Sequence, residues 1–281
     1  MKLLRHGPLG SEKPGAVDAD GKIRDLSGRI DDVNGSTLSD ASIEKLRALD
    51  LSSLPEVSDS VRLGACVGSV GKLVCVGLNY SDHAAESGLD LPPEPVLFFK
   101  ATSAIGGPND SIQIPKDSKS VDWEVELAIV IGKDGKYIAE SDAMQHIAGF
   151  CIVNDVSERD FQNNRSGQWV KGKSADTFGP MGPWMVTRDE IADPQALDMF
   201  LNVNGDSRQR GSTSTMVYQV PFLVSYISQF MSLQAGDVIS TGTPPGVGMG
   251  MTPPQYLKAG DVVTLGIAGL GEQRQDVIAH S

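Results

Sequence analysis

Three carboxylates stand at every second position in the segment Asp122-Trp123-Glu124-Val125-Glu126-Leu127. Because side chains alternate between the two faces of a β-strand, Asp122, Glu124 and Glu126 are predicted to share one face. Like charges at this spacing repel each other, so something must compensate them. Solvent around an exposed face is one explanation, and a bound divalent cation is the other.

The dimensions of a strand limit how many of these carboxylates one ion can bind. At a rise of roughly 3.3 Å per residue, neighbours on one face lie roughly 6.6 Å apart and the outer two roughly 13 Å apart. An ion with ligand distances near ~2 Å can bridge neighbours but not the outer pair. A further ligand should therefore come from elsewhere, and Asp155 is a candidate because it follows another predicted strand, the apolar run 149–153.

The types of candidate ligand point to a hard metal ion. The four histidines of the chain form no H-x-H or H-x-x-x-H pair, which argues against a histidine-rich zinc or iron site. Carboxylate oxygens favour Mg²⁺ or Mn²⁺. The spacing of glycines in 240–248 does not match a dinucleotide-binding loop, and a G-x-S-x-G nucleophile motif is absent.

A second group of chemical interest lies in the segment Gly77–Gly88, which is predicted to pass from a strand end into one or two helical turns. His83 and Glu86 are three residues apart, so they share a helical face and can hydrogen-bond. A carboxylate that orients an imidazole can serve as a general base that activates water. The same pair is also common on protein surfaces without any catalytic role.

The elements that would hold these residues are mostly strands. Residues 1–65 are predicted to form a small N-terminal α+β domain, with two short strands around a turn within 16–26 and a helix over 39–48. Residues 66–281 are predicted to form a mostly β, metal-binding catalytic domain. Its expected elements are strands over 72–77, 123–131 and 149–153, a helix over 220–231, and two Gly-Asp turns at 236–237 and 260–261 that each lead into a strand.

Composition narrows the class of protein. The 281 residues are 40% hydrophobic and 21% charged, as in ordinary globular proteins. A net charge of −12 argues against a nucleic-acid partner. Because an apolar run near ~20 residues and a signal peptide are both missing, we expect a cytoplasmic protein without membrane contact. The three cysteines are expected to be reduced and buried.

Taken together, these segments resemble the fumarylacetoacetate hydrolase family. The resemblance covers about Lys72 to the C-terminus and rests on five motifs in order: Gly77–Gly88, Asp122–Leu127, Asn154–Gln162, Gly172–Pro183 and Ser240–Gly248. The N-terminal segment resembles that of a bacterial branch, often labelled ureidoglycolate lyase, that includes 2,4-diketo-3-deoxy-L-fuconate hydrolases.

The resemblance implies a fold and a set of site residues. The fold is mostly β with α, a mixed β-sandwich roll with a small N-terminal α+β domain, in a homodimer. The metal ligands it implies are Glu124, Glu126 and Asp155. Its catalytic and substrate-binding residues are the water-activating pair His83 and Glu86, Lys173 in preference to Lys171, and the substrate contacts Arg159, Gln162 and Thr241.

The activity implied is Mg²⁺- or Mn²⁺-dependent hydrolysis of a C–C bond in a small anionic diketo or acylpyruvate-type acid, for example a 2,4-diketo-3-deoxy sugar acid, through a metal-bound enolate. Oxaloacetate decarboxylation and ureidoglycolate cleavage are alternatives for the same site. An alternative from another class is a non-catalytic, metal-stabilised protein that binds a small molecule without consuming it.

Overall fold

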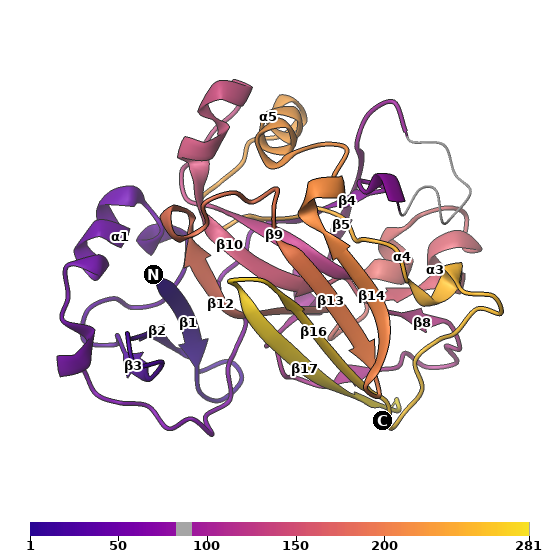
Figure 1. Ribbon diagram of the computed structural model, residues 1–281, viewed down its shortest axis with the longest axis horizontal. Helices are drawn as coiled ribbons and strands as arrows, with labels where there is room; N and C mark the ends of the chain where they lie inside the picture. Colours follow the sequence, from indigo (N-terminus) through magenta and orange to yellow (C-terminus); the bar gives the residue numbers. More distant parts are fainter. Residues whose placement is uncertain (83–91, 281) are drawn as a thin grey trace.

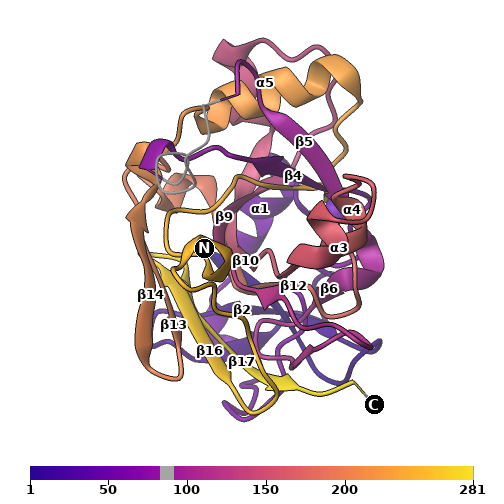
Figure 2. The same cartoon turned by 90° about the vertical axis from the view of Figure 1, so that its right-hand side faces the viewer.

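The computed structural model describes residues 1–82 and 92–280. In this part of the chain, a ten-stranded and a five-stranded sheet pack face to face, and a two-stranded ribbon lies beside them (Figures 1 and 2). The order in the larger sheet is β3-β2-β1-β12-β10-β9-β15-β4-β5, with β6 beside β12; the order in the smaller sheet is β14-β13-β16-β17-β7. The fold class expected from the sequence is confirmed.

The bounds of the elements are as follows. The ten-stranded sheet contains β1 (Lys2–His6), β2 (Lys13–Val17), β3 (Ile23–Asp25), β4 (Leu73–Gly77), β5 (Val96–Lys100), β6 (Ile105–Gly106), β9 (Val125–Ile131), β10 (Ile147–Asn154), β12 (Gly179–Thr187) and β15 (Val238–Ser240). The five-stranded sheet contains β7 (Ile112–Gln113), β13 (Asp198–Val203), β14 (Asp206–Ser212), β16 (Val262–Ile267) and β17 (Gly271–Ile278). The ribbon is formed by β8 (Val121–Asp122) and β11 (Ser157–Glu158), and the α-helices are α1 (Asp40–Arg47), α3 (Arg159–Asn163), α4 (Val170–Lys173) and α5 (Val220–Phe230).

Apart from Glu126, strand β9 is apolar, because it is buried on both faces. The side chains of Val125, Leu127, Ile129 and Ile131 enter the core between the two sheets. Those of Ala128 and Val130 enter a second core, which also contains apolar residues of the N-terminal region. Glu126 shares the face of Ala128 and Val130, because side chains on one face of a strand recur at every second residue.

The N-terminal region extends the larger sheet. Strand β1 pairs with β12 in antiparallel fashion, with Leu3 opposite Met185. The two short strands expected within 16–26 are β2 and β3, and the expected helix is α1, which Ser39 caps by accepting a hydrogen bond from the amide of Ser42. The division into domains at residue 65 stays a prediction.

Other expected elements are also present. Strands β4 and β10 correspond to the predicted 72–77 and 149–153, and α5 to the predicted helix, with a proline in its first turn. Both Gly-Asp turns form: Gly236 and Gly260 have φ of 90° and 97°, which glycine adopts without strain. No helix among the described residues is long and apolar enough to cross a membrane.

One predicted strand is wrong in extent. The expected strand over 123–131 begins at Val125, and Asp122 lies in the separate β8–β11 ribbon. Between Asp122 and Val125, hydrogen bonds to side chains interrupt the backbone pairing of the strand. The amide of Trp123 donates to its neighbour's carboxylate, Asp122 Oδ1, at 2.8 Å, and the amide of Glu124 donates to Asn154 Oδ1 at 3.2 Å.

Candidate metal and substrate site

Three buried carboxylates meet where β9 begins and β10 ends. Strands β9 and β10 are antiparallel with Val153 opposite Glu126, so the residue after β10, Asp155, lies beside Glu124, and its amide donates to the Glu124 carbonyl at 2.9 Å. One oxygen from each of Glu124, Glu126 and Asp155 lies within 4.8 Å of the others. The residues are only 6%, 2% and 0% exposed, so the solvated-face explanation for these carboxylates is wrong.

Lys173 bridges two of these carboxylates. It is the last residue of α4, and its Nζ donates to Glu124 Oε2 at 2.6 Å and to Asp155 Oδ2 at 2.7 Å. Burial by itself would lower the pKa of Lys173, but Asp155 and Glu124 raise it above the ordinary value for lysine. The ammonium therefore stays charged. Lys171 is exposed and donates to the backbone carbonyl of Arg165 instead.

Lys100 is a further buried cation that the sequence interpretation did not include. It ends β5, and its Nζ donates to Asp155 Oδ1 at 2.5 Å and to the Val156 carbonyl at 2.9 Å. Each carboxylate oxygen of Asp155 thus accepts from a different lysine. A lysine at the end of an apolar strand, in the run Val96–Lys100, was the available signal, because a cation in such a position needs a buried partner.

Arg159 joins the ribbon to the site. The guanidinium, in the first turn of α3, donates from Nε to Asp122 Oδ2 at 2.8 Å, from Nη2 to Glu124 Oε1 at 2.7 Å, and from Nη1 to Gln162 Oε1 at 2.9 Å. Because that contact occupies the amide oxygen of Gln162, its NH₂ group is the part that remains to meet a ligand.

Asp122 has a structural position outside the carboxylate group. Its two oxygens accept the amides of Trp123, Gly248 and Met249 in addition to the guanidinium of Arg159. The sequence argument that all three alternating carboxylates share one strand face is therefore corrected: Asp122 belongs to a different strand and fastens the loop 246–250 to it.

The surroundings give the two glutamates opposite acidities. Burial alone would raise the pKa of Glu124, but Lys173 and Arg159 lower it to about 2. Burial, together with the charges of Asp155 and Glu124, raises the pKa of Glu126 well above its usual value. Glu126 Oε2 nevertheless accepts the hydroxyl of Ser240 at 2.5 Å and the amide of Gly242 at 3.0 Å, which fix the direction of the carboxylate.

A cavity of about 130 Å³ opens beside these carboxylates. Its polar lining includes Glu124, Glu126, Arg159, Gln162 and Lys173. Phe98 and Trp169 form an aromatic wall, with ring centroids 5.3 Å apart, and the ring of Phe98 lies 5.0 Å from Lys173 Nζ. The structure thus brings together every predicted metal ligand and three of the predicted catalytic or substrate-binding residues.

The remaining predicted site residues are Thr241, His83 and Glu86. Thr241 is buried, and its hydroxyl donates to the Leu127 carbonyl at 2.8 Å, while its neighbours Gly242 and Thr243 line the cavity. His83 and Glu86 lie outside the described residues. The roles of all three stay predictions.

The donor set fits a divalent cation. Three carboxylates with one oxygen each within 4.8 Å of the others, in a buried position that raises the proton affinity of Glu126, form an arrangement that a hard dication would stabilise. The hydrogen bonds named above take one lone pair on each oxygen of Glu124 and Asp155, and each oxygen retains another for a metal. The group could therefore hold a metal ion in addition to its lysine contacts.

The chain combines two packed β-sheets with a buried group of two glutamates and one aspartate. Comparison of its sequence with known protein families assigns it to one of them. The family model described as Fumarylacetoacetate (FAA) hydrolase C-terminal matches residues 72–278. The chain belongs to the fumarylacetoacetate hydrolase family.

Known relatives support this membership over the full length. A protein of Burkholderia multivorans, named only as a presumed hydrolase, is 61% identical over 276 residues, which are 98% of each chain. Among solved structures, a fumarylacetoacetate hydrolase from psychrophilic Exiguobacterium antarcticum has a TM-score of 0.86 at 37% identity and covers 100% of both chains. A maleylpyruvate hydrolase from Sphingobium sp. has a TM-score of 0.82 at 31% identity, also covering 100% of both chains.

Proposed function

We propose that the protein is a Mg²⁺- or Mn²⁺-dependent hydrolase that cleaves a C–C bond in a small diketo or acylpyruvate-type acid. The observation that carries the proposal is the buried group of Glu124, Glu126 and Asp155, of which the two glutamates line a cavity together with Lys173. Two similar solved proteins are named as hydrolases of fumarylacetoacetate and maleylpyruvate, which are acids of this kind. The bacterial branch that the N-terminal segment resembles makes a 2,4-diketo-3-deoxy sugar acid a specific candidate substrate.

The charges around the cavity suit an anionic substrate once a metal is bound. Asp122, Glu124, Glu126 and Asp155, when ionised, carry one more charge than the three buried cations, Lys100, Arg159 and Lys173. A dication reverses this balance locally, although the chain as a whole carries −12. A bound Mg²⁺ or Mn²⁺ would act as a Lewis acid that polarises the substrate carbonyl.

Side chains of the protein are proposed to carry out the other steps of the reaction. Lys173 stays protonated and holds a positive charge beside the oxygen on which negative charge develops. Arg159 keeps its charge and orients Gln162, whose NH₂ group donates to the substrate carboxylate or a hydroxyl. His83, oriented by Glu86, is proposed to take a proton from water. The resulting hydroxide adds to the distal carbonyl, the C–C bond breaks with its electrons on the carbon next to the 2-keto group, and that carbon takes up the proton that His83 removed from water.

A substrate panel tests the proposal. Purified protein with Mg²⁺ should release a carboxylic acid and a 2-keto acid from acylpyruvates or from a 2,4-diketo-3-deoxy sugar acid. Carbon dioxide from oxaloacetate, or glyoxylate from ureidoglycolate, would instead support decarboxylase or lyase activity at the same cavity. If none of these acids is consumed while Mg²⁺ still binds, the hydrolase proposal is wrong and the metal-stabilised binding protein takes its place.

Two further measurements belong to this proposal. His83→Ala should abolish turnover yet leave Mg²⁺ binding unchanged, whereas a non-catalytic binding protein would keep its function in this variant. The family resemblance also leads us to propose a homodimer, which light scattering on the eluted protein would measure directly; a monomeric mass would contradict that part.

A further inference from the structure

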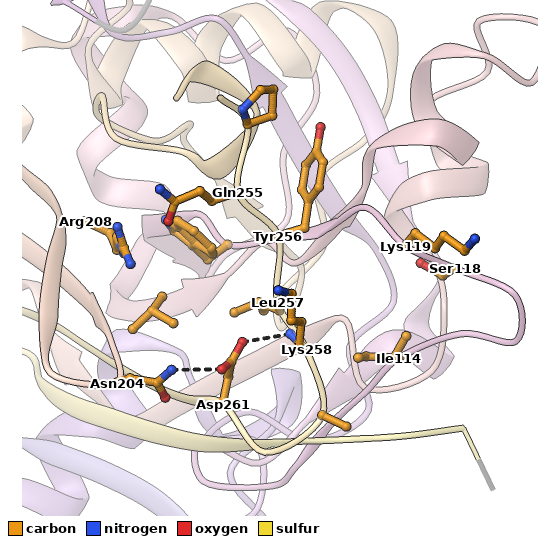
Figure 3. Close-up of a pocket in the computed structure, with 14 residues that line it drawn as sticks. Ile114, Ser118, Lys119, Asn204, Arg208, Gln255, Tyr256, Leu257, Lys258 and Asp261 are labelled. Carbon is orange, nitrogen blue, oxygen red and sulfur yellow. Dashed lines mark hydrogen bonds between the residues drawn. The ribbon is translucent and has the colours of Figure 1, made fainter. Parts of the chain in front are cut away.

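A second cavity, of about 720 Å³, shares none of its lining residues with the candidate site. Its walls come from three parts of the chain, 114–119, 203–208 and 254–261 (Figure 3). Trp123 also contributes to its lining. Small-molecule sites commonly enclose ~300–1,000 Å³. The cavity therefore has the size of a binding site for a small organic molecule.

The cavity has a positive lining in a negative protein. Lys119, Arg208 and Lys258 contribute cationic side chains, whereas Asp261 is the acidic residue among the residues that line it. The Asp261 carboxylate is already occupied, because it accepts Asn204 Nδ2 at 2.8 Å and the backbone amide of Lys258 at 2.7 Å (Figure 3). This excess of cations in a chain of net charge −12 favours an anionic ligand.

Arg208 is the cation best placed to bind an anion. Its Nε is buried and has no hydrogen-bond partner among the described residues. Its ion pair with Asp206 is long, 3.5 Å from Nη2, and that aspartate is largely exposed. A buried guanidinium N–H without an acceptor carries a desolvation cost, which an anionic ligand would offset.

The remaining lining favours a ligand with an apolar or aromatic body. The indole N–H of Trp123 donates to the Gly246 carbonyl at 3.0 Å, and its ring lines the cavity although it is only 1% exposed. The centroid of that ring lies 6.0 Å from Arg208 Cζ, and the more accessible apolar lining comes from Ile114, Pro254 and Tyr256. A cation beside an aromatic ring can bind the charged group and the body of an aromatic anion together.

The cavity is connected to the chain that positions the carboxylates. Trp123 is the residue between Asp122 and Glu124. The Leu257 amide donates to the Val121 carbonyl at 2.8 Å, and the Gln255 amide donates to the Gly248 carbonyl at 3.0 Å. A ligand in this cavity would therefore rest on the segments that hold Asp122 and the loop 246–250.

We propose that this cavity is a second binding site, distinct from the catalytic cavity, for a small organic anion with an aromatic or apolar body. The probe is 8-anilino-1-naphthalenesulfonate, which combines one sulfonate with aromatic rings and fluoresces when bound. Titration of the full-length protein should give a single saturable site. The neutral analogue N-phenyl-1-naphthylamine should bind at least about 10-fold more weakly, the loss expected when contacts to a charged group are removed.

Variants assign the probe to this cavity. Arg208→Gln and Lys258→Gln should each weaken binding of the sulfonate by about 10-fold. The matched control Arg274→Gln removes the same charge from an exposed position on β17 that does not line the cavity, and should change the affinity less than about 2-fold. Lys258 is exposed, so its variant is expected to fold, and thermal unfolding checks all three.

Three results would overturn the proposal: no saturable binding, equal affinities in the Arg208, Lys258 and Arg274 variants, or displacement of the probe by Mg²⁺ with oxaloacetate, which would place it in the catalytic cavity. None of these results depends on turnover, so the proposal can fail while the hydrolase proposal holds, and the reverse.

Discussion

Lys173 Nζ lies 2.7 Å from Asp155 Oδ2, so the end of a short helix is joined to the end of a central strand by a buried ion pair. The same Nζ also reaches Glu124. In the described part of the chain, this lysine is thus the cation that spans carboxylates from both strands of the proposed metal site. The contribution of Lys173 to the free energy of unfolding should be largest when no metal is bound, because protein cations alone then compensate the carboxylate charges.

Replacement of this lysine by Met should make stability depend on metal. Loss of one partner from a buried ion pair typically costs about 3–5 kcal/mol, so Lys173→Met in EDTA should lose unfolding free energy of this order. Saturating Mg²⁺ should restore more stability in the variant than in the wild type. Urea unfolding with EDTA and with Mg²⁺ measures both effects. The exposed control Lys171→Met should change stability by less than about 0.5 kcal/mol; equal losses in the two variants would refute this role for Lys173.

The ligand assignment predicts a specific loss of metal binding in Glu126→Gln. The amide keeps the shape of the side chain but supplies no anionic oxygen, so Mg²⁺ affinity should fall by more than about 100-fold, beyond the usual effect of changing an outer-shell partner. Isothermal titration with Mg²⁺ is the measurement. Glu44→Gln, at an exposed position of α1, is the matched control. An unchanged Mg²⁺ titration in Glu126→Gln would show that this residue is not a ligand.

Much of this site can be predicted from local sequence, because the spacing of residues along a strand determines the face to which each side chain points. Glu124 and Glu126 lie at the start of a strand, and Asp155 follows the next one; antiparallel pairing of adjacent apolar strands was sufficient to bring them together. The turns at Gly236 and Gly260 were likewise predictable, because Asp237 and Asp261 each accept a backbone amide within their own turn.

The rest depends on contacts between distant segments. Asp122 has the same spacing as the two glutamates, but its partners at 248 and 249 lie more than a hundred residues away, and they draw it into another strand. Lys100 is separated from Asp155 by 55 residues, and the β1–β12 pairing joins the N-terminus to the middle of the chain. Periodicity carries no information about such partners, since it reports only which face of an element is buried.

Asp122 should be required for stability rather than for metal binding. In Asp122→Asn, the side-chain NH₂ would face backbone amides or Arg159, all of which are donors, so about 1.5–3 kcal/mol of unfolding free energy should be lost. Mg²⁺ affinity should change far less than in Glu126→Gln. Urea unfolding and Mg²⁺ titration of the same sample distinguish the two effects. Asp206→Asn, at the exposed first residue of β14, is the control and should be close to neutral. Loss of Mg²⁺ binding without loss of stability would place Asp122 among the metal ligands instead.

His6 should make stability fall in mildly acidic solution. Burial lowers its pKa below 6.5, although Asp25 opposes this shift, and its Nε2 is buried without a hydrogen-bond partner in the described chain. As the pH falls, the unfolded state therefore takes up the proton first. The contribution of neutral His6 to the free energy of unfolding is complete above pH ~6.5 and declines as the pH falls towards the lower folded-state pKa.

The pH dependence of His6 can be separated from that of the carboxylates by comparison with His6→Leu. Between pH 7.5 and 5.5, the wild type should lose more unfolding free energy than this variant, by at most about 1.4 kcal/mol per pH unit for one proton. Urea unfolding at closely spaced pH values gives the difference. The exposed histidine at position 280 supplies the control, since His280→Gln should keep the wild-type profile. Parallel profiles for the wild type and His6→Leu would mean that His6 binds its proton equally well in both states, contrary to its buried position on β1.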